Sequence, residues 1–210
     1  MKFYDSLIAP SPRRVRMLIA EKGIDIETVY IDLGSGEHLK SPFIEINPKA
    51  SVPVLLLDNG VMLNESMAIS IYLDSIFPDN NLTGINPIER AVIANAQLDM
   101  ELNGLLAIGE CYRNSASGFV GRALVGPINY EQIPELAERG RSRIKIFFTD
   151  LNERLSKSKY VAGDRFTVAD ITAFISIQFS ANCVKEKPSE DAVHLQSWYK
   201  AISLRDCAKV

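Results

Sequence analysis

The sequence predicts an α/β N-terminal domain joined to an all-α C-terminal domain. Residues 1–79 contain four short apolar segments separated by turn residues or helical patterns, whereas residues 87–210 show helical spacing without convincing strand alternation. Residues 77–87, F-P-D-N-N-L-T-G-I-N-P, have the composition of a linker. We therefore expect one domain over residues 1–79 and a second over residues 87–210.

The N-terminal half follows the order β-α-β-(α)-β-β-α. Its first helix is expected to begin at Ser11-Pro12, a favoured N-cap followed by a favoured first helical residue, and to end at Gly23. The β-α-β unit implies a parallel strand pair and the turn at 58–60 implies a hairpin, so the sheet should be mixed. Strands are expected at residues 2–7, 26–31, 54–57 and 61–63. Two further helices are expected at residues 42–46 and after residue 64, the latter with Ala68, Ile69, Tyr72, Leu73 and Ile76 on one side.

The C-terminal half contains only helical patterns. Asn86-Pro87 and Glu89 begin one helix as N-cap, first residue and capping-box acid. Thr167 and Asp170 form a second capping box, and the helix after it is apolar on nearly all sides, so we expect it to be central. Apolar residues with helical spacing mark the first, a middle and the last helix: Ala91, Ala94, Leu98, Leu102 and Leu105; Ile144, Phe147, Phe148, Leu151 and Leu155; Leu195, Trp198, Tyr199 and Ile202.

Composition excludes several function classes. The net charge of −3, without a long basic run, gives nucleic-acid binding little electrostatic support. No apolar run approaches the ~20 residues of a membrane-spanning helix, and the N-terminus has no apolar signal region. Three scattered cysteines and two histidines favour neither a disulfide framework nor a metal site. We expect a cytoplasmic protein with no membrane, nucleic-acid or metal partner.

Pro53, in the segment S-V-P-V, stands at the entrance of the third predicted strand. Proline has no N–H, so no ordinary ladder bond forms there. A cis Val52–Pro53 bond would leave the N–H and C=O of Val52 free for an extended ligand. A trans proline that starts an edge strand is the alternative, because only about 5–6% of X–Pro bonds are cis.

Polar residues stand at two predicted helix starts. Glu65-Ser66 precedes a helix whose N-terminal N–H groups would suit a carboxylate, while Glu65 would pair with an amine. Ser11, where the first strand meets the first helix, would stabilise the thiolate of a ligand through its hydroxyl. Ordinary helix capping explains both sites equally well. His38, in the loop after the second strand, is a candidate carboxylate ligand or an idle surface residue.

These motifs, in this order, resemble the cytosolic glutathione S-transferase family over essentially the whole chain. The matching segments are the S-V-P turn, the helix start N-E-S-M-A-I-S-I-Y-L and the segment G-D-R-F-T-V-A-D-I. The resemblance implies a thioredoxin-like first domain, a helical second domain and glutathione as co-substrate. It implies a cis Pro53, Val52 pairing with the cysteinyl part, Glu65 and Ser66 at the γ-glutamyl end, and His38 near the glycine carboxylate.

The sequence departs from the family at the residue that activates the thiol. Serine-type members carry a hydroxyl about five residues before the position of Arg14, where this chain has Ala9. It looks most like atypical fungal and bacterial members that lack the usual Tyr, Ser or Cys. Ser11 is the nearest hydroxyl and becomes the candidate catalytic residue, with helix N–H groups or a water as alternatives. Arg113, Asn114, Ser115 and Ser117 would supply the contacts that hold such a water. The electrophile is expected over Ile8, Ala9 and Pro10 on one side and the segment 111–119, which includes Arg113 and Asn114, on the other.

Two further expectations concern assembly and activity. The resemblance implies a homodimer, in which Asp99 would reach the partner's glutathione or simply remain solvated. The expected activity is transfer of glutathione to a small hydrophobic electrophile, typical of detoxification enzymes. The N-terminal half contains no cysteine, so any thiol it uses must arrive as a ligand. A non-catalytic glutathione-binding or assembly module and a glutathione-dependent isomerase or peroxidase are the alternatives.

Overall fold

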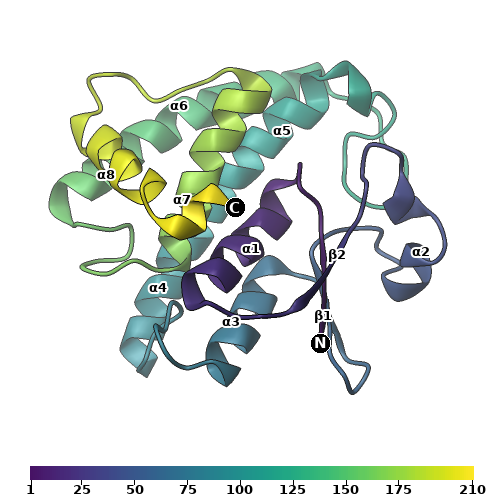
Figure 1. Ribbon diagram of the computed structural model, residues 1–210. Helices are drawn as coiled ribbons and strands as arrows, with labels where there is room; N and C mark the ends of the chain where they lie inside the picture. The colour runs from purple at the N-terminus through teal and green to yellow at the C-terminus, as the bar shows by residue number, and fades with distance from the viewer.

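The computed structural model describes residues 1–210 and places a small sheet with its helices beside a bundle of helices (Figure 1). The sheet has the order β2-β1-β3-β4, formed by β1 (Lys2–Asp5), β2 (Glu27–Tyr30), β3 (Val54–Leu56) and β4 (Met62–Leu63). β1 and β2 are parallel, and the other two pairs are antiparallel. The predicted mixed sheet is therefore confirmed, with every strand shorter than expected.

Three helices belong to this half: α1 (Pro10–Lys22), α2 (Phe43–Ile46) and α3 (Ser66–Ile76). The prediction that Ser11 caps α1 was wrong, because the helix begins two residues earlier, with Ala9 as its N-cap and Pro10 as its first residue. Proline suits that first position, where its missing N–H costs no helical bond. Gly23 ends α1 in the left-handed conformation, at φ 63°, as predicted.

The second half is helical throughout. It contains α4 (Pro87–Asp99), α5 (Leu106–Ser115), α6 (Pro134–Lys157), α7 (Val168–Phe179) and α8 (Val193–Ser203). A π-helical segment, Met100–Leu105, joins α4 to α5. Gly104 in this segment is required by packing, since a Cβ there would lie 2.7 Å from the ring of Phe147.

α7 forms the centre of the molecule, as its apolar sequence predicts. All residues from Val168 to Ile177 are buried, and α7 packs against α1, so a single core cluster extends across both halves. The predicted capping box of Thr167 and Asp170 starts this helix. Asp170 also accepts hydrogen bonds from Val161 N and the indole of Trp198. Burial raises the pKa of Asp170 to about 6, although these donors favour its charged form.

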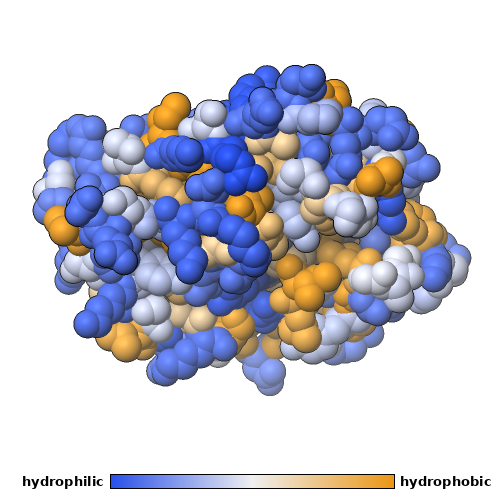
Figure 2. All heavy atoms as spheres, turned by 90° about the horizontal axis from the view of Figure 1, so that it is seen from above, coloured by the Kyte–Doolittle hydropathy of each residue, from blue (hydrophilic) through white to orange (hydrophobic).

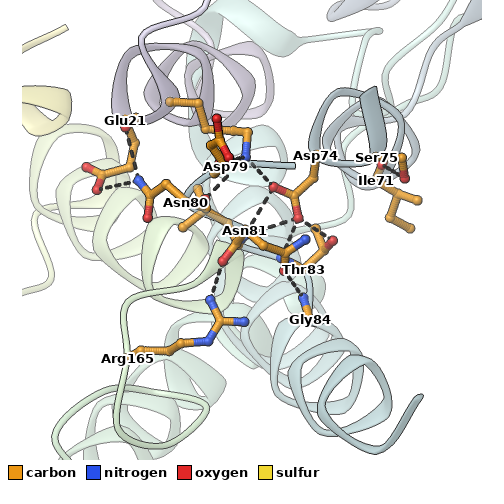
Figure 3. A network of polar contacts seen from close by, with 12 residues as sticks. Glu21, Ile71, Asp74, Ser75, Asp79, Asn80, Asn81, Thr83, Gly84 and Arg165 are labelled. Atoms are coloured by element: carbon orange, nitrogen blue, oxygen red, sulfur yellow. Dashed lines mark hydrogen bonds and ion pairs between the residues drawn. The ribbon is translucent and has the colours of Figure 1, made fainter. Parts of the chain in front are cut away.

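The linker between the halves is held by the buried carboxylate of Asp74, at the end of α3 (Figure 3). Asp74 accepts the ammonium of Lys22 at 2.6 Å and the backbone N–H groups of Leu82 and Thr83. Lys22 and these donors lower the pKa of Asp74 despite its burial. Arg165, from the loop before α7, donates to the carbonyl of Asn81, so residues of both halves form hydrogen bonds with the linker.

Candidate functional site

The start of α1 offers a single unpaired backbone N–H. The first four N–H groups of a helix have no partner within it; here they belong to Ala9, Pro10, Ser11 and Pro12. The two prolines have none, and that of Ala9 bonds the carbonyl of Ser6 at 3.3 Å. Only the N–H of Ser11 therefore points out of this helix end, next to the half-buried hydroxyl of the same residue.

The start of α3 differs from that of α1 in having several free N–H groups. Glu65 is its N-cap, and its exposed carboxylate makes no hydrogen bond. No proline follows, so the N–H groups of Ser66, Met67 and Ala68 all lack a helical partner. This end suits a carboxylate, with Glu65 beside it for an amine. Glu65 and Ser66 therefore stand, as predicted, at the start of a helix whose N–H groups are free.

A hydrogen bond joins the two helix starts. The buried hydroxyl of Ser66 donates to the carbonyl of Ser11 at 2.9 Å. The side chain of Ser66 therefore fixes the spacing between α1 and α3, while its N–H remains available to a ligand. Sequence reasoning brought Ser66 and Ser11 to the same site without predicting that one would hold the other.

Val52 and Pro53 directly precede β3 in the chain. The Val52–Pro53 peptide bond is cis, as the family resemblance implies. Pro53 is buried, and β3 begins only at Val54. The N–H and C=O of Val52 take part in none of the hydrogen bonds that the backbone makes outside helices and strands. They are therefore free for an extended peptide ligand.

A polar network supports the start of α1 from the helical half. The buried guanidinium of Arg14 forms an ion pair with Glu101 at 3.1 Å, in the π-helical segment. Gln97 donates to the same carboxylate at 3.3 Å. π-helical turns often occur at functional sites, and here the turn brings Glu101 to α1. No sequence signal predicted Glu101, since it is 87 residues away from Arg14.

The arginines around the start of α1 are all engaged within the protein. Arg16 pairs with Asp5 at 2.5 Å. Arg13 donates to Gln178 on α7 and to carbonyls of the C-terminal segment, Ala208 and Val210. The three arginines therefore do not form an open anion-attracting cluster.

His38 lies in a short helical turn, Glu37–Leu39, and contacts the helical half. Its Nε2 is 3.3 Å from a guanidinium nitrogen of Arg122, in the loop between α5 and α6 (residues 116–133). Since a guanidinium only donates, Nε2 accepts, and neutral His38 carries its proton on Nδ1. Burial, together with Arg122 and Arg113, lowers the pKa of His38. Arg122 was not among the predicted site residues.

Arg113 and Asn114, predicted near the electrophile, instead hold the α5–α6 loop in place. Arg113 donates to the carbonyls of Arg122, Ala123 and Leu124 and stacks on Phe119. The buried amide of Asn114 binds the carbonyl of Glu110 and the N–H of Ile133. These contacts engage both side chains within the protein.

Exposed apolar residues flank the candidate site. Leu7 and Ile8, directly before Ala9 and Pro10, are 66% and 75% exposed. Val120 and Leu124, on the α5–α6 loop, are 66% and 54% exposed. Seen from above, apolar atoms gather around a hollow on the face where β1 ends (Figure 2). Side chains of this kind suit a hydrophobic small molecule.

Asp99, predicted to contact a partner's glutathione, binds within its own chain. It pairs with Arg154 on α6 and accepts from Asn103 at 2.7 Å. A groove of about 740 Å³ lies beside this pair, between α4 and α6, and contains none of the predicted glutathione-binding residues. No group of three or more His, Cys, Asp or Glu is placed to hold a metal ion. None of the helices has the length and apolar character needed to cross a membrane.

Comparisons with known proteins agree with this geometry. Residues 9–76 match the family model "Glutathione S-transferase, N-terminal domain" and residues 114–206 match "Glutathione S-transferase, C-terminal domain". Glutathione S-transferase 2 of Saccharomyces cerevisiae is 35% identical over 100% of this chain and 88% of its own length.

Solved structures show the same likeness. Crystal structures of Gtt2 from Saccharomyces cerevisiae and of a glutathione S-transferase domain-containing protein from Marinobacter aquaeolei superpose with TM-scores of 0.89 and 0.88. Gtt2 is 33% identical, and the match covers 100% of this chain and 99% of the Gtt2 chain. The Marinobacter aquaeolei protein is 35% identical, and the match covers 99% of each chain. With both halves matched by family models and a relative above 30% identity across 100% of this chain, the chain belongs to the glutathione S-transferase family.

Proposed function

We propose that this glutathione transferase activates the thiol of bound glutathione at the start of α1 and transfers it to a small hydrophobic electrophile. The observation that carries the proposal is the pairing of two helix starts by the Ser66–Ser11 hydrogen bond. One start offers three free N–H groups and a free carboxylate, and the other a single N–H beside a hydroxyl. The first suits the zwitterionic γ-glutamyl end, and the second suits a sulfur anion.

Glutathione would then extend from α3 past Val52 toward His38. The free N–H and C=O of Val52 would pair with its cysteinyl backbone, as an added strand does. This pairing brings the thiol toward Ser11. The electrophile would approach between Leu7 and Ile8 on one side and the α5–α6 loop on the other, because both carry exposed apolar side chains.

Activation of the thiol requires only modest stabilisation of its anion. A thiol with a pKa of about 8.5 is only a few per cent thiolate at pH 7. Lowering this pKa by two units takes about 2.7 kcal/mol. Hydrogen bonds to a charged group contribute about 1.5–3 kcal/mol each. The N–H and hydroxyl of Ser11 together are therefore sufficient, without a residue at position 9 that carries a hydroxyl.

We also propose a homodimer in the cytoplasm. Several apolar residues of the α4–α5 region, among them Val92, Leu98 and Leu102, are about half exposed. Exposed apolar residues gathered on one region are typical of a surface covered by a second subunit. The three free thiols, Cys111, Cys183 and Cys207, fit a reducing compartment. Size-exclusion chromatography with light scattering checks the dimer; a monomer at all concentrations would contradict it.

Calorimetric titration with glutathione, followed by turnover of a generic aryl halide, tests the function. We expect a Kd between about 1 μM and 1 mM and formation of the thioether product. S-Methylglutathione should bind without turnover, which separates the binding site from the chemistry. Failure to bind at about 10 mM glutathione, well above that range, would reject the proposed site, and binding without any turnover would favour a non-catalytic module.

A further inference from the structure

Arg122 and its surroundings form a cationic cluster at the junction of the two halves. Arg122 and Arg113 are half-buried, and neither makes an ion pair in the structure. Their nearest basic neighbour is His38, whose pKa both arginines lower. Glu131, beside Gly121 on the same loop, forms no ion pair with either arginine. The cluster therefore carries positive charge without a compensating carboxylate.

The two arginines differ in what remains available to a ligand. Arg113 is committed to three backbone carbonyls and to the ring of Phe119. Arg122 has a single polar contact, from one guanidinium nitrogen to Nε2 of His38 at 3.3 Å. A guanidinium has five N–H donors in a planar fork that matches a carboxylate. Most of the donors of Arg122 are thus unused.

His38 is poorly placed to bind an anion itself. Its Nε2 already accepts from Arg122, and its Nδ1 is shielded from solvent without a partner. In the neutral form it carries no charge to attract a carboxylate. Its contact with Arg122 instead fixes the direction of that guanidinium, across 84 residues of sequence and between the two halves.

We propose that Arg122, oriented by His38, binds the glycine carboxylate of glutathione and thereby links the bound tripeptide to the α5–α6 loop. The inference rests on the proposed function, which places the glycine end of glutathione near His38. Arg122 is the binding residue and His38 a positioning residue. Val120 and Leu124 flank Arg122 in sequence, so ligand binding at Arg122 also holds the apolar wall of the electrophile site.

Calorimetry with two ligands measures the contact at Arg122. The glycine monoethyl ester of glutathione lacks the negative charge of the glycine carboxylate and carries a small ethyl group in its place. In the unaltered protein the ester should bind about 10-fold or more weakly, as expected for loss of a charged hydrogen bond. In Arg122→Met the two ligands should bind within about twofold of each other. Lys145→Met, which removes an exposed charge on α6 without an ion-pair partner, should keep the full preference.

Three His38 variants test its positioning role. His38→Leu should reduce the preference for glutathione over the ester, while His38→Gln, which keeps an acceptor for Arg122, should restore most of it. In the Arg122→Met background, His38→Leu should cause no further loss, because interacting positions are non-additive. A further loss in that background would overturn the assignment and make His38 the direct ligand.

Hydrogen exchange gives a readout independent of activity. Glutathione should slow exchange at residues 116–133 in the unaltered protein but not in Arg122→Met. Equal affinity of the unaltered protein for glutathione and ester would overturn the inference and leave the proposed function standing. An equal loss of affinity for both ligands in Arg122→Met would also overturn it, since that result indicates a structural role. Failure of both ligands to bind the unaltered protein would reject the function and the inference together.

Discussion

The two helix starts at the candidate site differ in the number of free N–H groups and in the side-chain group beside them. α3 begins without proline and presents three free N–H groups behind an exposed carboxylate. α1 begins with Pro10 and Pro12, so one N–H remains, beside a hydroxyl. The difference shows how one site separates two tasks. Several donors at α3 can hold a ligand end firmly, whereas α1 can stabilise only a small charge at one atom.

The largest expected effect is on binding at α3. Glu65→Gln should weaken glutathione binding about 10- to 100-fold, because a charged hydrogen bond to the amine becomes a neutral one. The side chain is exposed and makes no hydrogen bond within the protein, so the free energy of unfolding should not change. Calorimetry and thermal unfolding measure the two quantities. Glu135→Gln, an exposed acid in the first turn of α6, is the matched control.

The hydrogen bond between the helix starts should affect both tasks. Ser66→Ala removes its donor and leaves a buried polar contact unmade, so we expect the protein to lose about 1–2 kcal/mol of stability. Glutathione binding should weaken about fivefold because the spacing of α1 and α3 relaxes. Denaturant unfolding and calorimetry measure these changes. Unchanged stability would show that the Ser66–Ser11 bond does not hold the two helices.

Ser11→Ala should alter the chemistry at α1 and leave binding at α3 intact. With only the N–H remaining, the pKa of the bound thiol should rise by about 1–2 units, the equivalent of losing one hydrogen bond to a charged group. The pH dependence of turnover and the ultraviolet absorbance of the thiolate both report this pKa. The Kd for S-methylglutathione should remain the same. An unaltered pKa would remove Ser11 from thiol activation.

The smallest effect should come from giving α1 a second donor. Pro12→Ala restores an N–H at the third position of the helix, pointing in the same direction as that of Ser11. We expect the pKa of the bound thiol to fall by up to about 0.5 unit, which raises turnover near pH 6.5. Pro12 is buried, so stability must be measured alongside. A higher thiol pKa would mean that donors at α1 do not face the sulfur.

The sequence predicted those features of the fold that depend on residues close together in the chain. The capping box of Thr167 and Asp170 and the left-handed Gly23 occur where expected, because each depends on residues a few positions apart. The start of α1 was misplaced by two residues, since both Pro10 and Pro12 suit a first helical turn. Ala91 and Leu98, placed together by helical spacing, are exposed, because α4 buries a different face that carries Ile93, Ala96 and Gln97. Ala68 of α3 is exposed as well.

Contacts between distant segments were beyond prediction. Asp170 was predicted as a helix cap, but its bond to Trp198 depends on how α8 packs. Arg113 was expected beside the electrophile, and its donors instead organise the α5–α6 loop. The resemblance placed His38 at the site but gave no sign of its contact with Arg122, which forms only where the two halves meet.

By itself, the sequence determined the order of elements, the proline before β3, the Glu65-Ser66 pair at α3 and a first half without its own thiol. These follow from the conformational preferences and chemistry of residues close together in the chain. Only the tertiary structure decided that Ser66 holds Ser11, that Glu101 reaches Arg14 and that Arg122 rests on His38. Such pairs join residues more than 50 positions apart, and their geometry exists only after the core has packed.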